Sequence, residues 1–109
     1  TLNEIASQSN LTIELQETAL PVKPQVHAAC EMLGFDPLYV ANEGKLVAFV
    51  KPEDAERILS VMHQTRYGEE AVIIGRVIRT NHPHVRLRTA IGGTRLIDML
   101  PGEMLPRIC

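Results

Sequence analysis

A cysteine, Cys109, ends the chain and follows Pro106, Arg107 and Ile108. A thiol on the last residue has few backbone constraints, so it can enter another active site as a nucleophile or as a tethered carrier. Its reactive form is the thiolate, which the adjacent terminal carboxylate opposes and the Arg107 guanidinium favours. Pro106 stiffens the approach by restricting the residue before it. The tail is therefore predicted to be a short arm with a reactive tip, and the alternative is an incidental surface cysteine.

A second candidate site is the polar segment Asn42-Glu43-Gly44-Lys45, which lies between two apolar runs. A glutamate presented on a loop can accept a proton from a substrate, which makes Glu43 a candidate general base. Lys45 is a candidate phosphate contact. The alternative is a solvated turn in which Asn42 and Gly44 adopt positive φ.

The other metal-binding residue types give no comparable pattern. Cys30 falls on an apolar helical stripe, so it is expected to be a core thiol rather than a ligand. A Cys30–Cys109 disulfide is not expected without a secretion signal. No metal site is predicted, because the four histidines lack the spacing of a zinc site. They are His27, His63, His82 and His84, of which the last two flank a proline and are expected at a hairpin tip.

Composition limits the classes of partner. The chain has 109 residues, of which 45% are hydrophobic, and this is enough for one domain with its own core. A formal charge of −2 provides no basic field for a polyanion, so nucleic acid is excluded as a partner. No apolar run approaches the roughly 20 residues that cross a bilayer, and the start lacks a signal peptide. A cytoplasmic protein with no membrane partner is expected.

The first half of the chain must position the polar segment. A capping-box pattern at Thr1 and Glu4 predicts a short helix through Ser7, and apolar residues at 11, 13 and 15 predict a strand. A helix is expected from Pro24, because residues 26, 29, 30 and 33 form one apolar stripe and Gly34 can close it. Residues 38–41 and 46–50 are predicted to be two strands joined by the polar turn. A further helix begins at Pro52, with an apolar stripe at residues 55, 58, 59 and 62.

The last third is predicted to be β structure that leads into the tail. Strands are expected over residues 71–79 and 85–91, with a turn at 81–84 between them. Gly92-Gly93-Thr94 is expected to be a bulge or bend before a segment at 95–100. The fold class is therefore α+β, an α/β sandwich with helices on a mainly antiparallel sheet, related to the ferredoxin-like layout. Residues 1–102 are expected to form the domain and residues 103–109 a flexible tail.

Several strings together resemble the C-terminal part of the HypE family of hydrogenase expression and formation proteins. The resemblance runs from the first residue to the last and is most specific at the tail. The strings are Thr1-Leu2-Asn3-Glu4-Ile5-Ala6, Leu20-Pro21-Val22, Ala41-Asn42-Glu43-Gly44-Lys45-Leu46, Ile74-Gly75-x-Val77 and Pro106-Arg107-Ile108-Cys109.

That resemblance implies the second domain of a protein related to aminoimidazole ribonucleotide synthetase. The N-terminal domain, which would form the homodimer and most of the ATP site, is absent from this sequence, and the missing initial methionine agrees with that. Full-length members are carbamoyl dehydratases that use ATP with magnesium. This part alone is expected to bind no cofactor and to be inactive.

The resemblance also assigns roles to the candidate residues. Cys109 would receive a carbamoyl group from the carbamoyltransferase HypF, and dehydration would convert it to a thiocyanate. The cyano group would then pass to iron on a HypC–HypD complex, as a ligand of nickel–iron hydrogenase. Glu43 matches the family's catalytic glutamate as general base, Arg107 would orient the arm or contact phosphate, and Lys45 and Asn42 are weaker candidates.

Two other functions fit the same residues. The chain could be a small ferredoxin-like interaction module in which the terminal cysteine is incidental. It could also carry a redox-sensing or metal-sensing thiol.

Overall fold

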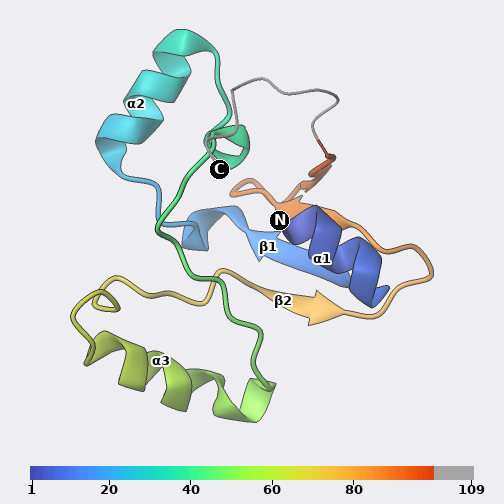
Figure 1. Ribbon diagram of the computed structural model, residues 1–109. Helices are drawn as coiled ribbons and strands as arrows, with labels where there is room; N and C mark the ends of the chain where they lie inside the picture. The colour runs from blue at the N-terminus through green and yellow to red at the C-terminus, as the bar shows by residue number, and fades with distance from the viewer. Residues whose placement is uncertain (100–109) are drawn as a thin grey trace.

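The computed structural model describes residues 1–99, which fold into one mixed four-stranded sheet and three α-helices (Figure 1). The strand order is β2-β1-β3-β4, and β1 pairs antiparallel with β2 and parallel with β3, whereas β3 and β4 are antiparallel. The predicted α+β class with a mainly antiparallel sheet is confirmed. The elements are α1 Leu2–Ser9, β1 Thr12–Gln16, η1 Glu17–Ala19, α2 Pro24–Leu33, η2 Pro37–Tyr39, η3 Pro52–Asp54, α3 Ala55–His63, β2 Gly75–Ile78, β3 Val85–Arg88 and β4 Thr94–Leu96.

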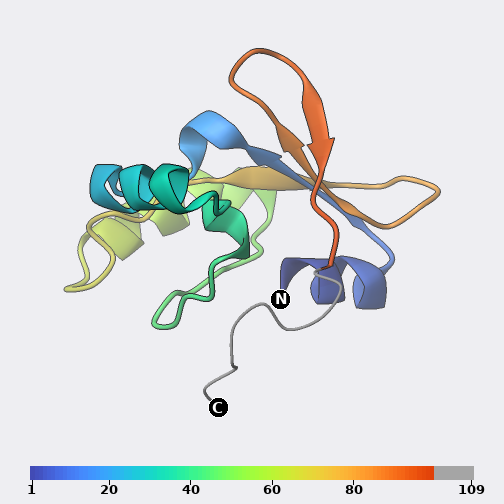
Figure 2. The same cartoon turned by 90° about the horizontal axis from the view of Figure 1, so that it is seen from above.

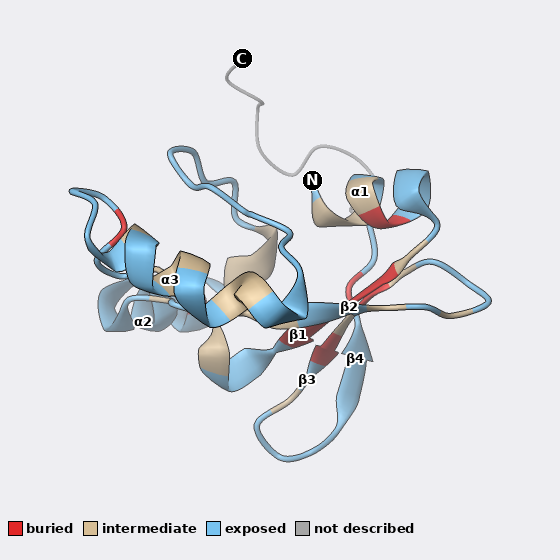
Figure 3. Cartoon of the chain, turned by 90° about the horizontal axis from the view of Figure 1, so that it is seen from below, coloured by how far each residue is buried: buried red, intermediate tan, exposed pale blue. Residues whose placement is uncertain are grey.

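The core lies between α1 and one face of the sheet (Figures 2 and 3). Alternation along β1 and β3 directs four branched apolar side chains toward α1, which contributes Ala6. The helix runs two residues beyond the predicted Ser7, to Ser9, and is capped by Asn10, whose φ of 56° is left-handed. The capping box is incomplete, because the Thr1 side chain makes no cap bond, although the Thr1 amino group lies 3.1 Å from Glu4. The buried apolar residues of the core are Ala6, Ile13, Leu15, Val85, Leu87 and Ile97.

Helix α2 has the predicted start and the predicted left-handed end at Gly34, with φ 69°. Its apolar stripe is not buried as predicted, because only Cys30 is covered while Leu33 is 66% exposed. The reason is placement, since α2 lies beside the sheet rather than across it (Figure 1). The stripe predicted for α3 is the side of the helix that is partly covered, but none of its residues is fully buried.

The two strands predicted over residues 38–41 and 46–50 are wrong. The first run forms η2, and its Leu38 and Tyr39 pack against the core. The second run forms no strand, and no strand of residues 1–99 pairs with it. Its Phe49 remains 47% exposed. A short apolar run forms a strand only where a neighbouring strand edge accepts its backbone hydrogen bonds.

The turn expected as a hairpin tip at residues 81–84 instead spans the end of β1. Strands β2 and β3 flank β1 and do not pair with one another. The Ile13 N–H donates to the His84 carbonyl at 3.0 Å, and the buried Thr12 hydroxyl lies 2.5 Å from that of Thr80. Of the two conformations predicted for the Gly92-Gly93-Thr94 segment, the bend is the one that the structure shows. It completes the β3–β4 hairpin, with Gly92 at φ 88°.

Candidate functional site

The Asn42-Glu43-Gly44-Lys45 loop extends from the body of the domain (Figure 2). All four residues are exposed. Gly44 has a φ of 74°, and a Cβ added there would meet nothing within 4 Å, so the backbone conformation alone favours glycine. The positive φ expected for Gly44 is confirmed, whereas Asn42 does not have one. The loop presents Glu43 to solvent, where an incoming group can reach its carboxylate.

Cys109 and Arg107 lie outside the described residues, as do residues 103–109 of the predicted tail. The last described residue is Met99, which precedes Cys109 by ten positions. An extended chain of that length spans at most about 33–36 Å. The meeting of Cys109 with Glu43 therefore stays a prediction.

The segment η2 leads into the loop of residues 42–45, the Glu43 loop, and forms its base. This segment is held by an aspartate that sequence reasoning missed. The Leu38 N–H donates to Asp36 Oδ1 at 2.9 Å, which caps η2, and Arg95 Nη1 donates to Asp36 Oδ2 at 2.5 Å. Arg95 belongs to β4, 59 residues away in the chain. The Asp-Pro pair at residues 36–37 was a signal for the cap. Nothing in the sequence identified Arg95 as its ionic partner.

A second missed cluster lies on the sheet face opposite α1. Alternation places Glu14 on the polar side of β1, yet its side chain is only 1% exposed. The strand register sets Glu14 beside both Arg76 of β2 and Arg86 of β3. Each carboxylate oxygen accepts two N–H groups, Oε1 from Arg76 at 2.8 and 3.0 Å and Oε2 from Arg86 at 2.6 and 2.8 Å. Each guanidinium thus donates two N–H groups to one oxygen, and hydrogen bonds between ionised groups are stronger than those between neutral ones.

The two arginines determine what Glu14 can do. Hydrogen bonds from Arg86 and then from Arg76 hold the pKa of the Glu14 carboxyl below its usual range, although burial opposes this shift. A carboxylate with a low pKa and both oxygens occupied is a poor proton acceptor. The cluster therefore joins three strands and does not supply a base.

This cluster predicts a specific pH dependence of stability. Because the pKa is lower in the folded state, ionised Glu14 stabilises the fold fully above its unfolded pKa of about 4.3, and the contribution is lost as pH falls through the lower folded value. Glu14→Gln is expected to lower the urea midpoint of the chain at pH 7 and at pH 5 by the same amount. The difference from the parent should shrink below about pH 4.

The matched control is Glu69→Gln, which removes an exposed carboxylate. It is expected to leave the midpoint nearly unchanged at every pH. A difference between Glu14→Gln and the parent that stays constant down to pH 3 would show that the carboxylate charge contributes nothing.

The sequence profile described as AIR synthase related protein, C-terminal domain, matches residues 1–88. This range is most of the chain and includes the Glu43 loop, the Glu14 cluster and the first three strands. The chain belongs to the AIR synthase related family.

Relatives of this AIR synthase related domain match it along its whole length. The carbamoyl dehydratase HypE of Bradyrhizobium diazoefficiens is 56% identical over 109 residues, which are 100% of this chain and 32% of the relative. The HypE of Escherichia coli is 44% identical over 108 residues, 99% of this chain and 32% of the relative. The chain thus spans about a third of the length of these curated relatives. The resemblance to HypE is confirmed.

Solved structures agree with the fold. The crystal structure of the hydrogenase maturation protein HypE in complex with ATP superposes with a TM-score of 0.88 at 46% identity, and the match covers 99% of this chain and 33% of that one. A HypE–HypF complex superposes with a TM-score of 0.82 at 41% identity, over 89% of this chain and 31% of that one.

Other candidate sites in the AIR synthase related domain are limited. Cys30 is only 6% exposed on α2, as expected of a buried thiol. Within residues 1–99, no group of three or more His, Cys, Asp or Glu side chains is placed to hold a metal ion. The same residues contain no helix long and apolar enough to span a bilayer.

Proposed function

We propose that this chain is the C-terminal domain of an ATP-dependent carbamoyl dehydratase of the HypE type. In the full-length protein, an S-carbamoyl group on Cys109 would be converted to a thiocyanate. The observation that carries the proposal is the 56% identity to a carbamoyl dehydratase along all 109 residues, a range that contains both the Glu43 loop and the cysteine tail. Solved HypE with bound ATP supports the nucleotide, and magnesium is proposed as the cation that accompanies it.

The proposed reaction removes the elements of water from a thiocarboxamide. The carbonyl oxygen is a poor leaving group until phosphoryl transfer from ATP converts it to a phosphate ester. Loss of phosphate then forms the C≡N bond as the nitrogen gives up its protons. Glu43 is the proposed proton acceptor, because a carboxylate on an exposed loop can meet a group delivered by the tail.

Arg107, Lys45 and Asn42 have supporting roles in this proposal. Arg107 adjoins the carrier along the chain, and its guanidinium suits a phosphate oxygen or the terminal carboxylate. Lys45 lies two residues after Glu43 on the same loop and would contact phosphate. Asn42 would orient the thiocarboxamide by hydrogen bonding.

The proposed partners follow from the reaction. HypF would load the carbamoyl group, which the solved HypE–HypF complex supports. A HypC–HypD complex would accept the cyano group on iron, for the nickel–iron centre of hydrogenase. Homodimerisation and most of the ATP site would belong to the remaining two thirds of the full-length protein, so the 109 residues alone are expected to be inactive.

Intact-mass analysis of the full-length protein tests this function. After incubation with HypF, carbamoyl phosphate and ATP, we expect a carbamoyl adduct followed by a cyano adduct, both mapped to the peptide that contains Cys109. The matched control lacks the last four residues and should remain unlabelled. An adduct located on Cys30, or no adduct on the parent, would contradict the proposal.

A pull-down beside the mass analysis separates the dehydratase from an interaction module. A module with an incidental cysteine would lose partner binding when residues 106–109 are removed, but Cys109→Ser would bind normally. The mass analysis would then show no carbamoyl or cyano adduct.

A further inference from the structure

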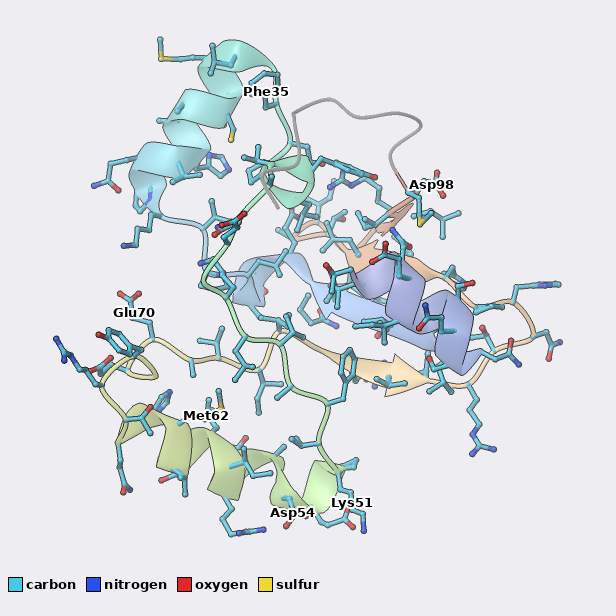
Figure 4. All side chains as sticks on the ribbon, in the orientation of Figure 1. Phe35, Lys51, Asp54, Met62, Glu70 and Asp98 are labelled. Carbon is cyan, nitrogen blue, oxygen red and sulfur yellow. The ribbon has the colours of Figure 1, made fainter. Side chains whose placement is uncertain are left out.

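The Asp36–Arg95 ion pair connects the two parts of the domain from which the proposed reactive groups extend. Glu43 lies seven positions after Asp36, and Cys109 lies fourteen positions after Arg95. The pair joins Asp36, the N-cap of η2, to β4 by a hydrogen bond, and β4 pairs in the sheet with β3. Figure 4 labels Phe35, which precedes Asp36, and Asp98, three positions after Arg95, and both lie in the upper part of the view.

The Asp36 side of the tie is stiff. Pro37 restricts φ, the Leu38 N–H donates to Asp36 Oδ1, and the Tyr39 N–H donates to the Asp36 carbonyl at 3.0 Å. Leu38 and Tyr39 also pack on the core. A displacement of Asp36 would therefore move η2, from which the chain leads into the Glu43 loop.

The Arg95 side is anchored through β4. Strand β4 pairs with β3, and beyond it the Ile97 N–H donates to the Val85 carbonyl at 2.9 Å, which places Ile97 in the core. The chain then continues through Met99 toward the tail. The Asp36–Arg95 contact consequently links two firmly held segments that are remote in sequence.

We propose that Asp36 and Arg95 are a positioning pair for the dehydration step, which holds the base of the Glu43 loop relative to the root of the Cys109 arm. The inference rests on the proposed function. The side chains of Asp36 and Arg95 are 28% and 46% exposed, and ion pairs this accessible contribute little to stability. The pair is therefore expected to affect the dehydration rate more than the stability of the fold, because small misplacements of reacting groups slow reactions strongly.

The test measures single-turnover thiocyanate formation in the full-length protein already carbamoylated on Cys109. Asp36→Asn keeps an oxygen for the Leu38 N–H but presents an amide to Arg95, and Arg95→Gln removes the guanidinium. Each is expected to slow dehydration about tenfold, with an unchanged KM for ATP and an unchanged rate of carbamoylation by HypF. Arg95→Lys retains the charge and should restore most of the rate.

Two controls distinguish positioning from stability. The Asp54–Arg57 pair on the other side of the molecule has a comparable contact of 2.7 Å, so Asp54→Asn should dehydrate at the parental rate (Figure 4). The double variant Asp36→Asn/Arg95→Gln should be no slower than the slower single variant, since both remove the same interaction.

Three outcomes would overturn the positioning role. They are parental rates in both single variants, losses that multiply in the double variant, and an equal fall in carbamoylation and dehydration. If the parent itself forms no thiocyanate, the proposed function fails instead, so the two failures are distinguishable.

Discussion

Cys109→Ala is expected to abolish both carbamoylation and thiocyanate formation in the full-length protein. The proposed intermediates are bound covalently to the Cys109 sulfur, and alanine has no atom that can attack the carbamoyl donor or hold the product. The expected loss is complete rather than graded. Intact-mass analysis after incubation with HypF, carbamoyl phosphate and ATP measures it directly.

The matched control for that experiment is Cys30→Ala. Cys30 is buried on α2, so its thiol is not available to a partner enzyme, and its removal should leave both adducts in place. If Cys109→Ala still accepted the groups as well as the parent does, the carrier would be a different residue. Cys30 would then be the first alternative to examine.

Glu43→Gln should separate the two steps of the reaction. Glutamine has nearly the same shape but cannot take a proton, and removal of a general base typically slows a reaction by about 10²–10⁴-fold. Carbamoylation of Cys109 should proceed normally, because in the proposed function that step belongs to the partner HypF and does not use Glu43. We therefore expect the carbamoyl form to accumulate, with the rate of its conversion to thiocyanate measured by quenched-flow mass analysis.

One control for Glu43→Gln changes the same loop, and the other changes η3, which follows it in the chain. Glu53→Gln changes another exposed carboxylate, at the start of η3, and should convert at the parental rate. Gly44→Ala should give an intermediate loss, because φ 74° is strained for alanine and shifts the loop without touching the carboxylate. Rapid conversion by Glu43→Gln would require a different proton acceptor.

The exposure of Glu43 has a consequence for the proposed mechanism. A carboxylate in bulk water is well solvated, so the arriving arm or the rest of the protein must exclude water around it during dehydration. The surroundings provide apolar surface for such a cover, since Val47 and Phe49 follow the loop and both are about half exposed. Within this chain, the loop presents the Glu43 carboxylate to solvent and does not by itself enclose it in a pocket.

Local chemistry allowed much of the secondary structure to be predicted. The α2 boundaries follow from a proline at the first turn and Gly34 at the end, and the Gly44 turn follows from the freedom of glycine at positive φ. These features depend on residues a few positions apart, whose backbone preferences act in any context. The α+β class follows in the same way from the order of apolar periods.

Burial was predicted less well, because it depends on what lies across the chain. The continuous apolar run at residues 46–50 lacks a neighbouring strand within residues 1–99, and the stripe of α2 lies off the sheet. Apolar periodicity identifies a face but does not name the surface that covers it. These apolar faces are uncovered in a chain that spans about a third of the length of its curated relatives.

By itself, the sequence determined the family, the two ends of α2, the turn at Gly44 and the order Glu43 then Cys109 along the chain. Only the tertiary structure decided that Glu14 lies between Arg76 and Arg86, and that Asp36 meets Arg95 at the base of the Glu43 loop. These partners are 59–72 residues apart. Strand register brings the two arginines to Glu14 and the packing of η2 beside β4 brings Asp36 to Arg95, and neither is a property of a local sequence pattern.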